Sequence, residues 1–297
     1  MRVVVAGSSG LIGTALVAHL RAGGHEVLRL VRREPAAPDE RGWDPAAGRV
    51  DAGTFAGVDA VVNLNGVGVA DRPWSGARRQ AIRDSRNVPT DVLARAVAEH
   101  GVPTFVSQSA TGYYGDGGGV ALDESAPVGR GFLADVVRDW EAAAQPAREA
   151  GARVVHPRTG LVLSPSGGLL GPLKLVFGFA LGGRLGPGTQ YMPWVSLDDE
   201  VGGLAFLLGN DSLDGPVNLV GPTPVTNAEF TTTLAATLHR PAPFAVPAVV
   251  IRTLAGSMGE EMLLFGQRVV PTKLEAAGYR FRHRTLDEAL AGALDRS

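Results

Sequence analysis

Three glycines near the start of the chain have the spacing of a site that binds the phosphates of a dinucleotide. Gly7, Gly10 and Gly13 follow the β-branched run of residues 2–6 and precede an amphipathic stretch from Leu11 to Arg21. In such a strand–turn–helix unit the first glycine permits a tight turn, the second lets the backbone approach a pyrophosphate, and the third lets the helix pack against the strand. Free N–H groups at the start of the helix then face the anion. The alternative to a nucleotide site is that the glycines form a purely structural turn. The residues predicted to form this site are Gly7, Ser9, Gly10, Leu11, Ile12 and Gly13.

Two arginines at the end of the next expected strand, residues 27–31, bear on which dinucleotide would bind. An acidic residue there would accept hydrogen bonds from the ribose hydroxyls of NAD, whereas an arginine pairs with the 2′-phosphate of NADP and can stack on adenine. Arg32 is the better candidate, with Arg33 beside it. These residues favour NADP(H) over NAD as the cofactor. The alternative is that the two arginines are only a solvated pair of charges at a strand end.

The segments that must position these residues alternate between strand and helix patterns. Apolar runs at 60–64, 105–106 and 153–156 indicate strands, while residues 78–99 and 132–150 carry apolar side chains at helical spacing. Strands that alternate with helices of this length predict an α/β fold, a Rossmann-type doubly wound parallel sheet. We expect the cofactor across the carboxyl ends of the strands, where strand order reverses.

The later part of the chain has a looser pattern. We expect residues 1–160 to form the nucleotide-binding domain, with later segments returning to it, and residues 161–297 to form a smaller substrate-side lobe. Residues 164–188 are rich in glycine and proline, which predicts a binding loop, and regular structure returns at 193–208. The C-terminal extension, residues 224–297, has a mostly helical pattern broken by prolines.

Composition excludes several classes of function. The 297 residues are 45% hydrophobic and 20% charged with a net charge of -2, values of an ordinary soluble globular protein that argue against nucleic acid or an anionic membrane as a partner. There are no cysteines, and the six histidines lack the spacing of metal ligands, so no metal is expected. The Gly-Ser-Ser-Gly turn at 7–10 is too short for the nucleophile elbow of a hydrolase.

The expected location is cytoplasmic. The first strand begins at Arg2, which leaves no room for a signal peptide, and the apolar stretch 169–185 is too interrupted to span a bilayer. We expect a small-molecule substrate of unknown identity, and the sequence predicts no oligomeric state.

Motifs along most of the chain resemble the extended short-chain dehydrogenase/reductase family, which includes nucleotide-sugar epimerases. Besides the glycine turn, these motifs are Asn63–Gly66, Asn87–Thr90 and Ser107–Gly115, with Asn65 in place of the usual alanine. The resemblance implies that Leu64, Asn65 and Gly66 contact the cofactor.

The similarity is greater to an atypical, epimerase-like subgroup that carries its own C-terminal extension. Its motifs here are Ser85-Arg86, Gly112–Gly115, Trp140-Glu141, Gly182–Gly186, Gln267–Pro271 and Leu274–Tyr279. The resemblance implies that the chain binds NADP, that Arg86 contacts its phosphate or ribose, and that Leu161 lies near the nicotinamide. Ser196 stands where the subgroup has histidine, so no role of that histidine is carried over.

The Tyr-x-x-x-Lys pair on which the family's chemistry depends is absent. The lysines are 174 and 273, and the residues four before them are Leu170 and Val269. Alignment on Glu141 puts Leu133 and Val137 where tyrosine and lysine would stand. In the family the tyrosine exchanges a proton with the substrate while the cofactor exchanges hydride.

Three interpretations remain open. In the first, the protein is an NADP(H)-dependent oxidoreductase or epimerase whose proton donor comes from Ser109, Tyr113 or Tyr114. In the second, it is a non-catalytic NADP(H)-binding sensor or interaction protein. In the third, His156, Asp198 or Asp199 acts as acid or base. Each candidate catalytic residue could instead have a structural role. Ser109 would make a strand-end hydrogen bond, the tyrosines would pack, His156 would lie in the core, and the aspartates would begin a helix.

Overall fold

Nine strands form the large sheet of a computed structural model that describes residues 1–164 and 167–294. They are β1 (Arg2–Ala6), β2 (Glu26–Val31), β3 (Glu40–Asp44), β4 (Arg49–Val50), β5 (Ala60–Asn63), β6 (Thr104–Ser107), β7 (Ser109–Ala110), β9 (Arg153–Thr159) and β15 (Gly215–Leu219). The order is β15-β9-β6-β5-β1-β2-β3-β4, and β7 pairs with β9. Strand order reverses at β1, which pairs in parallel with β2 on one edge and β5 on the other. The predicted α/β fold with a mostly parallel sheet is confirmed.

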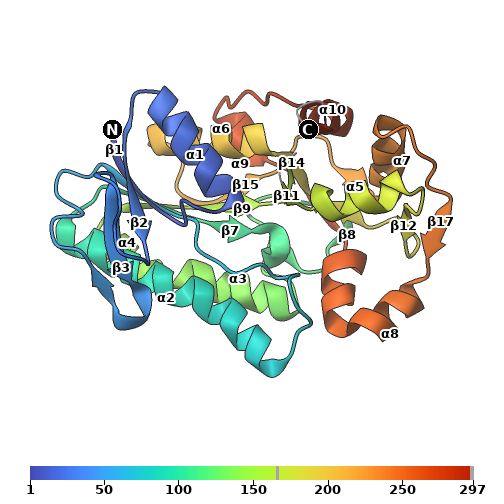
Figure 1. Ribbon diagram of the computed structural model, residues 1–297, viewed down its shortest axis with the longest axis horizontal. Helices are drawn as coiled ribbons and strands as arrows, with labels where there is room; N and C mark the ends of the chain where they lie inside the picture. The colour runs from blue at the N-terminus through green and yellow to red at the C-terminus, as the bar shows by residue number, and fades with distance from the viewer. Residues whose placement is uncertain (165–166, 295–297) are drawn as a thin grey trace. The chain divides into compact units, whose positions relative to one another are not determined.

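The strands at the centre of this sheet are apolar on both faces. Val3, Val4 and Val5 of β1 have no exposed surface, as expected for a parallel strand covered on both sides. Helices α1 (Leu11–Ala22) and α2 (Gly76–His100) lie on opposite sides of the sheet (Figure 1). On the α2 side, Leu93 and Val97 belong to one buried cluster with Val4 and Val61.

The helix predicted over 132–150 is two helices. They are α3 (Phe132–Ala142) and α4 (Gln145–Glu149). Pro146 has no N–H to donate to the carbonyl of Ala142, and it stands in the first turn of α4, where the missing N–H costs no helical hydrogen bond. The predictions for residues 78–99 and for the strands at 27–31, 60–64, 105–106 and 153–156 are confirmed within two or three residues at each end.

The chain divides into two compact units that are discontinuous in sequence. The first comprises Met1–Ser109, Val136–Pro157 and Val201–Val217, and it includes most of α6 (Leu197–Gly209). The second comprises Ala110–Asp135, Arg158–Glu200 and Asn218–Ser297. A single boundary at residue 160 does not describe this division, because the chain passes between the units several times.

The second unit combines small sheets with helices. Its three-stranded sheet has the order β11-β10-β14, and β12 pairs with β17, β13 with β16, and β18 with β8. Its strands are β8 (Gly118–Leu122), β10 (Leu161–Ser164), β11 (Gly167–Gly168), β12 (Gly183–Leu185), β13 (Tyr191–Met192), β14 (Trp194–Ser196), β16 (Val225–Thr226), β17 (Phe244–Val246) and β18 (Gln267–Val269). Its helices are α5 (Leu170–Gly178), α7 (Asn227–Thr237), α8 (Ala248–Gly259), α9 (Thr272–Ala276) and α10 (Leu286–Leu294), and Glu260–Leu264 forms a π-helical turn.

The binding loop predicted at 164–188 is wrong in part, because α5 occupies its middle. Leu170 and Phe177 of this helix are buried beside Trp194 and Phe230, so packing stabilises a helix despite the nearby glycines. Residues 165–166 of that stretch lie outside the described residues, as do residues 295–297 of the C-terminal extension. The rest of the extension is mostly helical, as predicted. No helix in the described ranges has both the length and the apolar character to cross a membrane.

Candidate cofactor site

The turn between β1 and α1 can be built only with glycine at two of its three positions. Gly7 has a φ of +79°, and a Cβ there would lie 2.7 Å from the carbonyl oxygen of Leu64. A Cβ on Gly13 would lie 2.2 Å from the carbonyl oxygen of Gly7. Gly10 differs, because among the described residues the only atom within 4 Å of its Cβ position is the oxygen of Gly7, at 3.4 Å. Gly7 and Gly13 therefore set the close approach of strand and helix, and Gly10 leaves its side open.

The first turn of α1 is electrostatically prepared for an anion. Gly10 has the extended backbone of an N-cap, and within residues 1–164 and 167–294 no side chain caps this helix and no acidic residue lies in its first turn. The first N–H groups of a helix have no partner within the helix, and here they belong to Leu11, Ile12 and Gly13. These groups could hold a phosphate.

A pocket of about 580 Å³ opens beside this turn, and it brings most of the predicted cofactor residues together. Seven predicted residues line it: Gly7, Ser9, Gly10, Arg32, Leu64, Asn65 and Gly66. The sequence did not single out the other lining residues as contacts: Pro45, Ala46, Val67, Asp84, Ser85, Val88 and Pro89. Those residues come from the segment after β3, the loop after β5 and the middle of α2, and only the fold places them beside the glycine turn.

Buried hydrogen bonds fix the segment after β5 that lines the pocket. The Asn63 side chain is fully buried, and its amide donates to the hydroxyl of Thr90 on α2 at 2.7 Å. Its Oδ1 accepts from the Nδ2 of Asn65 at 2.7 Å and from the backbone N–H of Asn65 at 3.2 Å. The Trp140 indole donates to the same Thr90 hydroxyl at 3.0 Å. Asn65 therefore holds the turn in shape, because its side-chain amide is occupied by Asn63.

Arg86 lies against the same segment without a carboxylate partner among the described residues. Its guanidinium donates to the carbonyl oxygens of Val67 and Ile82, both at 3.1 Å, and its Cζ lies 5.2 Å from the Trp140 ring centroid. Burial lowers the pKa of Arg86 to about 10, and the neighbouring charge of Arg78 acts in the same direction. A Cβ on Gly66 would lie 3.1 Å from the Arg86 Cζ. The side chain is thus a half-buried cation directly beneath the pocket-lining backbone.

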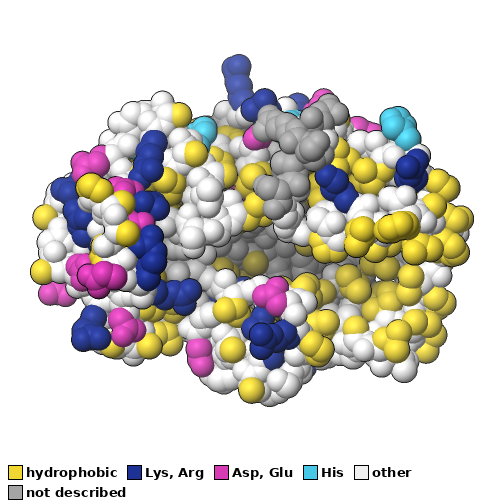
Figure 2. All heavy atoms as spheres, viewed as in Figure 1, with side chains coloured by type: hydrophobic (Ala, Val, Ile, Leu, Met, Phe, Trp, Pro, Cys, Tyr) yellow, Lys and Arg dark blue, Asp and Glu magenta, His cyan; other side chains and the backbone are white. Residues whose placement is uncertain are grey.

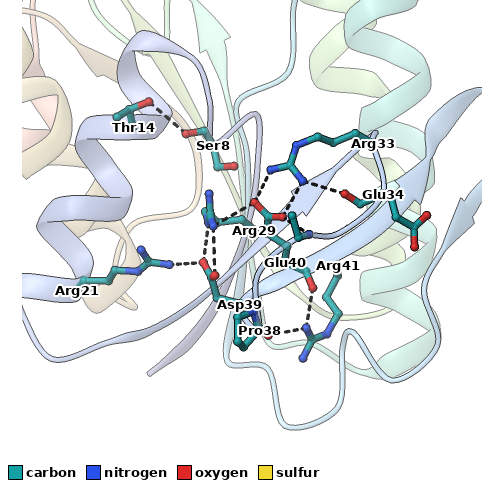
Figure 3. A network of polar contacts seen from close by, with 11 residues as sticks. Ser8, Thr14, Arg21, Arg29, Arg33, Glu34, Pro38, Asp39, Glu40 and Arg41 are labelled. Atoms are coloured by element: carbon teal, nitrogen blue, oxygen red, sulfur yellow. Dashed lines mark hydrogen bonds and ion pairs between the residues drawn. The ribbon is translucent and has the colours of Figure 1, made fainter.

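The two adjacent arginines after β2 have different surroundings. Arg33 donates to the Glu40 carboxylate through NH1 at 2.8 Å and NH2 at 2.6 Å (Figure 3). Arg32 lines the pocket, and none of the described residues accepts a hydrogen bond from it. Of the two candidates, Arg32 is the one whose guanidinium is available to a phosphate.

Ser109 and Glu141 meet in the first unit. The Ser109 hydroxyl, which is 1% exposed, donates to Oε1 of Glu141 at 2.6 Å. Val137, at the position expected for the family's lysine, is 4% exposed and lies one turn earlier on α3. His156 is buried with its Nδ1 3.4 Å from the carbonyl oxygen of Ser107, which agrees with a core histidine.

Tyr113 and Tyr114 belong to the second unit and differ in environment. The Tyr114 phenol is buried, donates to Oδ1 of Asn218 at 2.6 Å and accepts from Arg158 at 3.1 Å. Burial raises the pKa of Tyr114 to about 12. The Tyr113 ring stacks under the Arg158 guanidinium, whose Cζ is 3.4 Å from the ring centroid. In the described part of the chain no residue hydrogen-bonds the Tyr113 hydroxyl, so this phenol is the one free to meet a ligand.

The remaining candidates have structural surroundings. Asp199 is 2% exposed, and its carboxylate accepts from the Ser196 hydroxyl at 2.7 Å and from the backbone N–H of Arg282 at 2.6 Å. Asp198 and Asp199 lie in the first turn of α6, as expected. Leu161 begins β10 in the second unit. Within the described residues no group of three histidine or acidic side chains could hold a metal.

Comparison with known proteins defines the class to which this fold and pocket belong. The model of the NAD dependent epimerase/dehydratase family matches residues 3–221, and a domain of unknown function, DUF1731, matches residues 246–293. The chain belongs to the NAD dependent epimerase/dehydratase family.

Particular relatives match over nearly the whole chain. Epimerase family protein Mb2239 of Mycobacterium bovis is 52% identical over 294 residues, which cover 99% of this chain and 98% of that protein. Epimerase family protein SDR39U1 of Homo sapiens is 37% identical over 295 residues, 98% of each chain. A crystal structure of human SDR39U1 (isoform 2) with NADPH superposes with a TM-score of 0.91 at 34% identity, and all of both chains is covered.

Proposed function

We propose that this chain binds NADP(H) in the pocket beside α1 and acts as an oxidoreductase or epimerase on a carbonyl or alcohol. The observation that carries the proposal is the pocket itself. The N-terminus of α1, the open side of Gly10 and Arg32 face one space there, and among the described residues no side chain caps the helix and none pairs with Arg32. The relative whose whole chain superposes on this one, human SDR39U1, was crystallised with NADPH.

Each part of the cofactor has a complementary group in this chain. The N–H groups of Leu11, Ile12 and Gly13 would hold the pyrophosphate, because they are the free donors at the positive end of α1. Arg32 would pair with the 2′-phosphate. Arg86 supports an anion at Gly66 and Val67, because a half-buried cation without a counter-ion gains most from one. When bound, the cofactor supplies or accepts a hydride.

The proton donor proposed for the reaction is Tyr113, with Ser109 as the second hydroxyl. Tyr113 keeps its phenol free of protein partners among the described residues and has the Arg158 cation over its ring. Tyr114 is excluded from this role because its phenol is held by Asn218 and Arg158. Arg158 is the cation beside this phenol, and its guanidinium stacks on the Tyr113 ring.

A non-catalytic NADP(H) sensor is the second candidate. It is favoured by the apolar side chains Leu133 and Val137 at the positions of the family's proton-transfer pair, and by the engagement of Ser109 with Glu141. Neither apolar side chain can move a proton.

Nucleotide titration tests the cofactor assignment, with two adjacent arginines as matched variants. Fluorescence titration of the wild type should give at least about tenfold tighter binding of NADPH than of NADH, equal to about 1.4 kcal/mol. Arg32→Ala should abolish this preference, whereas Arg33→Ala should retain it because Arg33 is paired with Glu40. Equal affinities for the two nucleotides in the wild type would show that Arg32 is a solvated surface charge.

A turnover assay distinguishes an NADP(H)-dependent enzyme from a non-catalytic NADP(H) sensor. Purified protein is incubated with NADPH and a panel of carbonyl compounds and nucleotide sugars, and nucleotide oxidation and products are followed. Oxidation that requires one carbonyl class and is lost in Gly10→Asp supports the enzyme. Combining Ser109→Ala with Tyr113→Phe should then lower kcat at least about a hundredfold, or about 2.7 kcal/mol, with little change in NADPH affinity. Tight NADPH binding without turnover on any compound favours the sensor.

A further inference from the structure

Positive charge is concentrated in the loop after β5 and at the start of α2. Residues 66–86 contain five arginines and two aspartates, whereas the whole chain has a net charge of -2. Figure 2 shows Lys and Arg side chains gathered at the lower centre of the molecule, where α2 begins in Figure 1. Of these arginines, only Arg86 has a proposed role at the cofactor, and Arg83 pairs with Asp139 at 2.8 Å.

Two of these arginines converge on one short stretch of the loop. Arg78 and Arg86 lie eight residues apart on α2, so their Cα atoms are separated by about 12 Å along the helix. Arg86 nevertheless donates to the carbonyl oxygen of Val67 at 3.1 Å. Arg78 donates to the carbonyl oxygen of the next residue, Gly68. Burial is the main cause that lowers the pKa of Arg86, and the charge of Arg78 lowers it further, which agrees with two cations that lie close together.

The described residues do not fully neutralise these two cations. Arg86 has no carboxylate partner among them, and Arg78 has one, Asp71 at 3.4 Å. The Asp71 side chain is 63% exposed, so water screens this ion pair. The Arg78 side chain is only 15% exposed, and its buried Nε donates to none of the described residues. Half-buried cations without a full counter-charge are costly, and a bound anion would offset this cost.

Arg78 lies toward the end of α2 that is farther from Arg32. The two cavities that Arg32 lines take residues between Asp84 and His100 from α2. Arg78 precedes all of these, in the first turn of the helix, about 20 Å along the axis from the middle of that range. Because Arg32 and the N-terminus of α1 already provide for the phosphates of the cofactor, Arg78 is available to a second ligand.

We propose that Arg78, together with Arg86, binds an anionic group of the substrate, so that the substrate is a carbonyl or alcohol that carries a carboxylate or a phosphate. The inference rests on the proposed oxidoreductase or epimerase function, because it takes a substrate to bind beside the cofactor. Guanidinium groups bind both kinds of anion through paired N–H donors. An anion would displace the neutral carbonyl of Gly68 as the partner of Arg78, because charge-assisted hydrogen bonds are roughly twice as strong.

Isothermal titration calorimetry with inorganic phosphate, on the full chain saturated with NADPH, tests the proposal. The wild type should bind phosphate saturably, and Arg78→Gln should weaken this binding at least about tenfold, or about 1.4 kcal/mol. Arg79→Gln is the matched control, because it removes a neighbouring arginine whose Cζ lies 5.6 Å from the Trp74 ring centroid. It should bind phosphate as the wild type does. No saturable binding by the wild type, or equal binding by Arg78→Gln, would overturn the proposal.

A second variant distinguishes the charge of Arg78 from its contact with the loop. Arg78→Lys keeps the positive charge but lacks the planar group that donates to Gly68. It should therefore bind phosphate more weakly than the wild type and more tightly than Arg78→Gln. Equal phosphate affinities in the two variants would show that the loss comes from the loop and not from the charge, and would also overturn the proposal.

Titrations with and without NADPH identify the source of the anion. Phosphate binding at Arg78 that persists at saturating NADPH supports a substrate anion, whereas binding that NADPH abolishes would assign Arg78 to the cofactor and overturn the proposal. If NADPH does not bind, the proposed function fails, while phosphate titration of the nucleotide-free wild type and Arg78→Gln still tests the anion site. In the turnover assay, Arg78→Gln should raise KM for charged carbonyl compounds at least about tenfold with little change in kcat. Turnover confined to neutral carbonyl compounds would contradict the assignment.

Discussion

Arg33 and Glu40 form a two-pronged ion pair between the end of β2 and the start of β3, with N–O distances of 2.8 and 2.6 Å. The Glu40 side chain is 2% exposed and also lies 3.1 Å from Arg29. Arg32 precedes Arg33 in the sequence but lines the pocket beside α1, and no carboxylate of the described residues pairs with it. Two adjacent residues of the same charge therefore serve different purposes, one in holding β3 to the sheet and the other in facing the pocket.

The Arg33–Glu40 pair should make part of the stability of the fold depend on acid pH. The hydrogen bond from Arg33 is the main cause that lowers the pKa of Glu40 from 4.5 to about 2, and the backbone N–H of Ala36 contributes. A carboxylate with a lowered pKa stabilises the folded state above pH 4.5, and this contribution is lost as the pH falls towards 2. Arg33→Ala should reduce the fall in stability between pH 5 and 3.

Urea unfolding at several pH values measures this effect. The slope of the free energy of unfolding against pH should be shallower in Arg33→Ala and unchanged in Arg32→Ala, which removes the same charge one residue away. Identical slopes in all three proteins would show that Arg33 does not control the Glu40 titration.

Substitutions at Gly13 and Gly10 should have different effects. The first should lower the stability of the fold, and the second should lower the affinity for NADPH. A methyl group on Gly13 would lie 2.2 Å from the carbonyl oxygen of Gly7, so Gly13→Ala must displace α1 and should cost about 1–3 kcal/mol of stability. Gly10→Ala adds its methyl group to open space and should change stability by less than about 0.5 kcal/mol. Because that methyl group enters the pocket, NADPH affinity should fall at least about tenfold. Urea unfolding without nucleotide and NADPH titration give the two quantities, and equal destabilisation by both substitutions would contradict the assignment.

The sequence predicted the parts of the site that depend on local interactions. The conformation of the turn around Gly7, Gly10 and Gly13 depends on the absence of side chains at these positions. The glycine pattern could therefore be recognised from the sequence without knowledge of the fold. The break after Ala142 was equally local, because Pro146 stands in the sequence, but the apolar periodicity on both sides of it outweighed the proline in the sequence interpretation.

Long-range pairings could not be predicted. The sequence offered Arg33 as a second candidate beside Arg32, because its partner Glu40 reaches it only through the parallel pairing of β2 with β3. The hydrogen-bond partner of Ser109 could not be named from the sequence, because Glu141 is 32 residues away along the chain. The difference between Tyr113 and Tyr114 depends on Asn218, more than a hundred residues later.

Substitutions at Tyr114 and Tyr113 should also have different effects. The first should lower the stability of the fold, and the second should lower kcat. Tyr114→Phe removes the hydroxyl that donates to Oδ1 of Asn218 and accepts from Arg158 in a buried place, so it should cost about 1–3 kcal/mol of stability. Tyr113→Phe keeps the ring under Arg158 and should leave stability within about 0.5 kcal/mol. If the protein turns over, Tyr113→Phe alone should lower kcat at least about tenfold. Thermal unfolding and steady-state kinetics on both variants measure this, and a large loss of kcat confined to Tyr114→Phe would reverse the assignment.

Substitutions at Val137 and Leu133 test whether the lysine and tyrosine of the family's proton-transfer pair can be restored. We expect that they cannot. Val137 is 4% exposed, so Val137→Lys would bury an unpaired ammonium group at a cost of ~3–5 kcal/mol. Leu133 is half-buried, and Leu133→Tyr should be tolerated because a phenol can extend to solvent. Val137→Met is the matched control, because it adds similar length without charge, and it should cost about 1–3 kcal/mol, less than the lysine. Urea unfolding at pH 7 compares the three variants. If Val137→Lys is as stable as Val137→Met, the side chain at 137 reaches water or a carboxylate, and a lysine there could serve chemistry after all.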